Sequence, residues 1–153
     1  MSFLYRLIAT VFFIGYIPFA PGTFGSLVAL FLYYFIKDSP SAMGVAVVLS
    51  LLSGFLSAGR AEKFFKKKDP RNIVIDEFSG MLIAVLFLPP RPAYILTAFF
   101  LFRFFDVVKT WPIAGLERLK GSKGIMLDDI MAGIYANLIL QAVNFTNRAL
   151  HYL

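Results

Sequence analysis

The chain of 153 residues contains no cysteine, a single histidine (His151) and few charged side chains. The absence of cysteine excludes disulfide bonds, a thiolate nucleophile and a cysteine-ligated metal site. Charged residues make up 16% of the chain, against about 25% in soluble domains, whereas 59% of residues are hydrophobic and 18 are phenylalanine. This composition, with a mean hydropathy of +0.75, excludes a disordered or nucleic-acid-binding tail.

A single domain covering residues 1–153 fits the length of the chain. A soluble domain of this size would bury only about 70% of the surface of its unfolded chain, which leaves too little interior for so many apolar side chains. We therefore expect lipid to surround much of the protein. The net charge of +6 and the pI near 9.7 then favour an anionic membrane surface or an anionic substrate as partner. We do not expect the chain to bind nucleic acid.

Long uncharged runs without alternating polar residues predict helices rather than strands. Proline and glycine between residues 18 and 25 interrupt the first run, and Pro89 to Pro92 interrupt another. The sequence therefore predicts an all-α, membrane-embedded bundle of about six helices, either polytopic or partly inserted. We expect these helices at about residues 3–17, 24–37, 41–59 with an extension towards Phe65, 75–88, 93–109 and 128–149.

The basic residues predict which side of the bundle lies in the cytoplasm. If successive helices cross the layer, loops 18–23, 60–74 and 110–127 share one side, while the N-terminus and the other loops share the opposite side. The first side, with the helix ends beside it, holds eleven of the fifteen basic residues. The positive-inside rule makes this side cytoplasmic. Its run from Lys63 to Arg71 is expected to dock on anionic membrane lipids.

Five of the nine acidic residues form three small groups, each beside an apolar run: Asp76 with Glu77, Asp106, and Asp128 with Asp129. Asp76 lies thirteen residues before the proline turn and Asp106 lies fourteen after it, so a helical hairpin brings the two to about the same height. Asp128 and Asp129 are expected to open the next helix on the same side. All three groups can therefore converge at the cytoplasmic end.

Carboxylates gathered in an apolar bundle repel one another and lose hydration unless a cation neutralises them. Because the chain has no cysteine and its one histidine is distant, the ligands would all be oxygen atoms, which suits Mg²⁺ or Mn²⁺ rather than Zn²⁺. The alternative is that Asp76 and Asp128 only cap helices, where acids favour the N-terminal dipole.

Basic and polar side chains accompany the acids. Arg103, Asp106 and Lys109 follow one another at helical spacings and so share one face, which predicts a phosphate clamp or, alternatively, an internal salt bridge at the membrane boundary. The loop before the second helix supplies glycines and hydroxyls for a phosphate cradle, at Gly22, Thr23, Gly25 and Ser26. The alternative for this loop is a Pro-Gly turn that only ends a helix.

Four segments carry a resemblance to a known family. They read APGTFGS at residues 20–26, IVIDEF at 73–78, FRFFDVVKTWPI at 102–113 and GIMLDDI at 124–130. In this order and spacing they resemble the phosphatidylglycerophosphatase A family over about residues 15–140. One departure is Thr110, where a proline is expected before Trp-Pro.

The resemblance implies a Mg²⁺-dependent phosphatase that converts phosphatidylglycerophosphate in the bilayer to phosphatidylglycerol and inorganic phosphate during bacterial phospholipid synthesis. The expected location is the bacterial inner membrane, with the active site facing the cytoplasm. The family's acidic motif residues map to the five acids above, with Lys109 and the Thr23 loop beside them.

We expect four carboxylates to hold Mg²⁺: Asp76, Glu77, Asp128 and Asp129. Asp106 is then either a further ligand or the base that orients water, and Arg103, Lys109 and the Thr23 loop bind the phosphate. Attack by metal-activated water is the first choice of mechanism, and an aspartyl-phosphate intermediate is the alternative.

Two other classes of function compete with a phosphatase. A small ion or metabolite transporter could use the acidic cluster as an ion site, although the acids gather at one end of the bundle rather than at mid-depth. A non-enzymatic membrane scaffold would leave five acids and a basic clamp at one edge unexplained.

Overall fold

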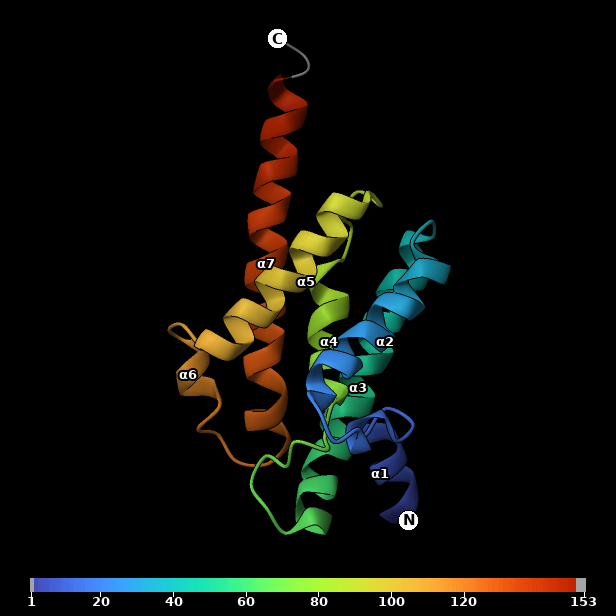
Figure 1. Cartoon of the computed structure of the whole chain (residues 1–153), viewed down its shortest axis with the longest axis vertical. Coiled ribbons are helices and arrows are strands. Elements are labelled where there is room, and N and C mark those ends of the chain that lie inside the picture. The colour runs from blue at the N-terminus through green and yellow to red at the C-terminus, as the bar shows by residue number, and fades with distance from the viewer. Residues whose placement is uncertain (1, 151–153) are drawn as a thin grey trace.

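Every regular element is helical within residues 2–150, which are the residues that the computed structural model describes (Figure 1). The α-helices in chain order are α1 (Ser2–Ala9), α2 (Pro21–Ile36), α3 (Pro40–Phe65), α4 (Ile75–Ala84), α5 (Pro92–Val108), α6 (Ile113–Leu116) and α7 (Ser122–Leu150), and a 3₁₀ turn, η1 (Ile14–Tyr16), lies between α1 and α2. The predicted all-α class is confirmed, and α6 is an additional short helix.

Proline fixes the first residue of three helices. Pro21, Pro40 and Pro92 each stand at the first helical position, where the missing N–H group costs no hydrogen bond. α2 therefore starts three residues earlier than expected from the sequence. As a result, Gly22 to Ser26 lie within the first turns of a helix rather than in a loop.

The first helix is shorter than the predicted 3–17, because the backbone at Ala9 forms a hydrogen bond with another segment instead of continuing the helix. The carbonyl of Ala9 accepts a hydrogen bond from the N–H of Val74 at 2.9 Å. Residues 11–13 then adopt φ angles of 45 to 70°, which an α-helix cannot contain. The prediction of one continuous helix is therefore wrong, because α1 ends at Ala9 and η1 follows after a tight turn.

α1 packs against the C-terminal half of α3, at the end of the bundle that also holds the 66–74 segment (Figure 1). The guanidinium of Arg6 lies 4.8 Å from the ring centre of Phe64, and that of Arg60 lies 4.4 Å from the ring centre of Tyr5. The expectation that the N-terminal end lies on the opposite side is therefore wrong, because α1 does not cross the bundle. Arg6 joins the basic residues of the predicted cytoplasmic side.

α4 is the central helix, with α2, α3, α5 and α7 packed around it (Figure 1). It runs in the same direction as α7, and two glycines let the two backbones touch. A Cβ atom at Gly133 would overlap the carbonyl oxygen of Gly80, and one at Gly80 would lie 2.6 Å from the carbonyl oxygen of Asp129. This contact fixes the register of α4 against α7.

In the described part of the chain, two helices are long and apolar enough to cross a bilayer: α3, with a mean hydropathy of 1.9, and α7, with 1.3. The 26 residues of α3 span about 39 Å, more than the ~30 Å hydrocarbon core. Only 33% of the apolar stretch of α3 is buried inside the protein, so most of its side chains face outward. Other outward-facing rings include Phe31, Phe35 and Phe100. Such an exterior suits a lipid environment.

Candidate metal and phosphate site

Three carboxylates converge where α4 and α7 cross. Asp76 and Glu77 lie in the first turn of α4, and Asp129 lies in the second turn of α7. One oxygen of each side chain lies within 4.8 Å of those of the other two. Each helix reaches the glycine contact one turn later, at Gly80 and Gly133, so the backbone crossing sets the distance between the carboxylates. We call these three residues the carboxylate cluster.

The carboxylate cluster lies inside the protein, and each of its side chains has one oxygen without a hydrogen-bond partner in the described part of the chain. Asp76 and Asp129 are buried, and Glu77 is half-buried. These oxygens are Oδ1 of Asp76, Oε2 of Glu77 and Oδ1 of Asp129, and no donor within residues 2–150 reaches them. Leaving a buried carboxylate oxygen unpaired is costly, so the arrangement favours a positive charge at its centre.

Burial raises the pKa of Asp76 well above its usual range, and the charge of Glu77 adds to the effect. Burial also raises the pKa of Glu77 to about 7. Both shifts arise mainly from burial, and the charge of Arg103 offsets only part of the effect on the pKa of Glu77. Unpaired oxygens from three side chains fit a divalent metal ion, and within residues 2–150 this is the one group of acidic or histidine side chains close enough to share one. His151 lies outside the described residues.

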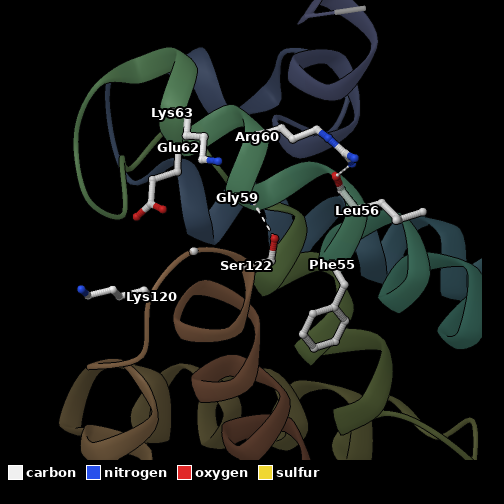
Figure 2. A pocket seen from close by; sticks show the side chains of 9 residues that line it. Phe55, Leu56, Gly59, Arg60, Glu62, Lys63, Lys120 and Ser122 are labelled. Atoms are coloured by element: carbon white, nitrogen blue, oxygen red, sulfur yellow. Dashed lines mark hydrogen bonds between the residues drawn. The ribbon is translucent and has the colours of Figure 1, made fainter.

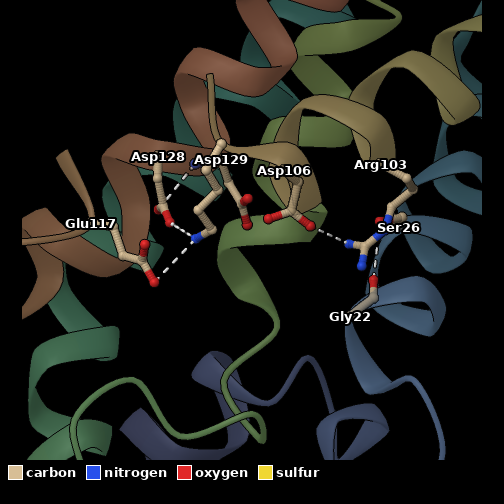
Figure 3. A network of polar contacts seen from close by, with 8 residues as sticks. Gly22, Ser26, Arg103, Asp106, Glu117, Asp128 and Asp129 are labelled. Carbon is tan, nitrogen blue, oxygen red and sulfur yellow. Dashed lines mark hydrogen bonds and ion pairs between the residues drawn. The ribbon is translucent and has the colours of Figure 1, made fainter. Parts of the chain in front are cut away.

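α5 carries Arg103 and Asp106, and both side chains lie beside the carboxylate cluster (Figure 3). Nη1 of Arg103 is 2.8 Å from Oδ2 of Asp106, so the two side chains form the ion pair predicted as the alternative to a phosphate clamp. The N–H bonds of Nη1 do not point at that oxygen, which leaves the guanidinium with donors for another acceptor. The charge of Asp106 acts on both Glu77 and Asp129. A phosphate clamp at Arg103 stays a prediction that this geometry permits.

Lys109 does not lie on the helical face predicted from its spacing. α5 ends at Val108 and Lys109 adopts a φ of 48°, so the helical spacing no longer applies to it. Its Nζ donates to Oδ2 of Asp128 at 2.7 Å and lies 3.4 Å from Oε1 of Glu117 (Figure 3). Burial lowers the pKa of Lys109, but the hydrogen bond and charge of Asp128 outweigh this and raise the pKa. The Lys109 ammonium is therefore already paired with two carboxylates.

Asp128 stands apart from the other three predicted metal ligands. Besides the bond from Lys109, its Oδ1 accepts a hydrogen bond from the N–H of Asp129 at 3.1 Å. Because α7 begins at Ser122, Asp128 lies in the second turn of the helix, and the expectation that it opens or caps that helix is wrong. In the structure, Asp128 therefore binds the ammonium of Lys109 and the backbone N–H of Asp129.

Two further acids belong to this neighbourhood and have no local signal in the sequence. Glu117, directly after α6, pairs with Lys109 across a turn. Asp69 lies within the Lys63 to Arg71 run, which is predicted to dock on lipid. Its charge nevertheless acts on Asp76, at the start of the helix into which this segment leads.

The first turns of α2 pack against the start of α4. A Cβ atom at Gly22 would overlap the carboxylate of Glu77, and one at Gly25 would contact the backbone just before α4. Ser26 is buried, and its hydroxyl donates to the carbonyl oxygen of Gly22 at 3.0 Å. These small residues let Glu77 come close to α2. A substrate-binding role for them and for the half-buried Thr23 stays a prediction.

Replacing Gly133 with Ala is expected to weaken divalent-cation binding by about tenfold or more and to lower the midpoint of thermal unfolding, because the added methyl group has no room against Gly80. Gly44 on α3 is the matched control, since a Cβ atom there meets nothing within 4 Å. Gly44→Ala should leave binding unchanged and slightly raise stability through helix propensity. Calorimetric titration with Mg²⁺ and thermal unfolding in detergent measure both effects. Unchanged cation binding in Gly133→Ala would show that the crossing does not set the cluster.

The chain is similar to one protein family and to several bacterial phosphatases. The family described as Phosphatidylglycerophosphatase A matches residues 7–144. A relative of that name from Escherichia coli is 36% identical, over 92% of this chain and 83% of its own length, and one from Haemophilus influenzae is 36% identical, over 92% and 88%. A relative from Bacteroides thetaiotaomicron, provisionally named a phosphatidylinositol-3-phosphatase, is 36% identical over 91% of this chain and 92% of its own length. No solved structure matches the chain.

Proposed function

The chain belongs to the phosphatidylglycerophosphatase A family, and from this premise we propose that it hydrolyses phosphatidylglycerophosphate to phosphatidylglycerol and inorganic phosphate. The family makes it a phosphoric monoester hydrolase of phospholipid metabolism, which favours an enzyme over a transporter or a scaffold. The observation that carries the proposal is the carboxylate cluster, whose unpaired oxygens lie beside the guanidinium of Arg103.

Mg²⁺ is the metal that these ligands suit best. Asp76, Glu77 and Asp129 offer only oxygen atoms, and proteins commonly bind Mg²⁺ with a few carboxylates plus the phosphate of a substrate. Bound there, Mg²⁺ would polarise the phosphoryl oxygens and increase the acidity of water. Asp128 would act as a positioning residue, because it bonds the backbone N–H of Asp129 and is itself fixed by Lys109.

Proton transfer and phosphate binding fall to α5. Arg103 would donate hydrogen bonds to the phosphate oxygens and offset their charge in a loose transition state. Asp106 would accept the proton of the attacking water as the water oxygen bonds to phosphorus. The bond from phosphorus to the glycerol oxygen would then break, that oxygen would take up a proton from water, and Asp106 would release its proton to solvent. Thr23, at the start of α2, is a further candidate donor to the phosphate.

The inner membrane of a bacterium, with the site facing the cytoplasm, is the location that fits the charges. Arg6, the C-terminal end of α3, the 66–74 segment and the segment before α7 gather basic side chains at one end of the bundle. The positive-inside rule assigns this end to the cytoplasm, and anionic lipids would be attracted to it. The relatives come from bacteria.

Phosphate release from phosphatidylglycerophosphate in detergent micelles with Mg²⁺ tests the function. We expect kcat/KM for this lipid to exceed that for phosphatidylinositol 3-phosphate by about tenfold or more, because the two headgroups differ in size and in hydroxyl pattern. Faster release from the inositol lipid would reassign the substrate. No release from either lipid with any divalent cation would refute the hydrolase itself.

A further inference from the structure

A cavity lies away from the carboxylate cluster, between the C-terminal half of α3 and the segment that leads into α7 (Figure 2). Its volume is about 580 Å³, which is within the range of sites that bind small molecules. Its walls include Phe55, Leu56, Arg60, Lys63 and Lys120, none of which takes part in the proposed hydrolysis.

The floor of this cavity is held in place by a contact between helices. The N–H of Gly59 donates to the hydroxyl of Ser122 at 2.8 Å, and a Cβ atom at Gly59 would lie 2.7 Å from that hydroxyl. α3 and the first residue of α7 are therefore in direct contact at two residues that line the cavity (Figure 2). The cavity does not depend on a side chain moving aside.

The charge of the cavity is positive. Arg60, Lys63 and Lys120 line it together with one acid, Glu62, which accepts a hydrogen bond from the N–H of Asp69 at 3.2 Å. Arg60 is fixed, because Nη1 donates to the carbonyl oxygen of Leu56 at 2.6 Å. Lys63 and Lys120 are exposed, and neither takes part in an ion pair within the described part of the chain.

One wall of the cavity continues an apolar face of α3. Leu49, Leu52 and Leu56 follow at helical spacings and are 57 to 60% exposed. Lys63 comes two turns after Leu56, so the same face passes from exposed leucines to a free ammonium group. A ligand that fits this face carries an anionic group at one end and a hydrocarbon chain at the other.

We propose that this cavity binds the phosphate of an anionic phospholipid that is not the substrate, with its acyl chains along Leu49, Leu52 and Leu56. Lys63 and Lys120 pair with the phosphate, and Phe55 packs beside the first part of the lipid tails. The bound lipid braces the contact between Gly59 and Ser122, and so the start of the helix that carries Asp129. The proposal concerns binding and does not rest on the proposed hydrolysis.

Native mass spectrometry of the full chain, equilibrated in neutral detergent with phosphatidylserine or phosphatidylcholine, tests this site. Phosphatidylserine is an anionic phosphodiester and is neither the proposed substrate nor its product. We expect the wild type to retain one phosphatidylserine in preference to phosphatidylcholine. Lys63→Gln/Lys120→Gln should weaken this retention by about tenfold or more.

Lys67→Gln/Lys68→Gln is the matched control, because it removes the same charge from exposed lysines of the neighbouring segment that do not line the cavity. Equal retention of phosphatidylserine by Lys63→Gln/Lys120→Gln and the wild type would overturn the proposal. Equal loss in the two double variants would overturn it as well, since it would indicate attraction by overall charge. Displacement of phosphatidylserine by inorganic phosphate at equal concentration would assign the cavity to a free anion instead. Thermal unfolding midpoints within error of the wild type show that both variants are folded.

Discussion

Replacing Asp129 with Asn is expected to lower kcat/KM for phosphate release by about 10³ or more while leaving the protein at least as resistant to heat without added metal. Asparagine keeps the size of the side chain but removes the charge that a divalent cation needs. The same change relieves the repulsion among three buried carboxylates. A variant that is inactive because it unfolds would lose stability, so the two measurements together separate a functional acid from a structural one.

Asp38→Asn is the control for that experiment. Asp38 is 79% exposed and pairs with Lys37 between α2 and α3, at the opposite end of the bundle from the cluster. Its loss should change activity by less than about twofold, since exposed ion pairs contribute little. Activity of Asp129→Asn within about fivefold of wild type would remove Asp129 from the site, whatever its stability.

Removal of divalent cations by EDTA is expected to abolish phosphate release, and added Mg²⁺ is expected to restore it. Binding to the folded state also stabilises it, by about 2.7 kcal/mol when the free cation is at a hundred times its Kd. For a chain of this length this corresponds to a rise of about 5–10 °C in the midpoint of thermal unfolding. Asp129→Asn should show no such rise, because a ligand is missing.

The requirement for cation should increase as the pH falls. Burial raises the pKa of Glu77 to about 7, so a proton competes with the metal ion below that pH. The Mg²⁺ concentration that gives half-maximal activity is therefore expected to rise between about pH 8 and about pH 6. Full activity in EDTA across this range would contradict the assignment of Asp76, Glu77 and Asp129 as metal ligands.

The sequence predicts most helices because long uncharged runs and prolines are local signals. The helices that begin at Pro21, Pro40 and Pro92 fall within three residues of their expected starts. The first helix does not, because the hydrogen bond from Val74 to the carbonyl of Ala9 comes from a segment 65 residues away along the chain. A local sequence pattern cannot predict such a long-range bond. The predicted position of the N-terminal end, on the opposite side of the bundle, is wrong for the same reason.

The candidate site likewise contains residues whose positions could be predicted from the sequence and residues whose positions could not. Asp76 and Asp129 could be expected to meet because their places relative to turns and loops can be counted along the chain. The role of Lys109 could not, since the spacing argument assumes that the helix continues, and it ends one residue earlier. Because Lys109 leaves the helical face, it pairs with Asp128 instead of a phosphate, and it also pairs with Glu117.

The backbone contact at Gly80 and Gly133 would hold the proposed metal ligands together before any cation arrives. The ordering entropy of the ligands is lost during folding rather than during binding, which is the basis of preorganisation. Two helices that already touch cannot move closer to follow a smaller ion, and the turn that links each carboxylate to the contact limits how far they can part. Such a fixed frame would discriminate by ionic radius, because Ca²⁺ takes six to eight oxygens at about 2.3–2.6 Å whereas Mg²⁺ requires six at about 2.0–2.1 Å.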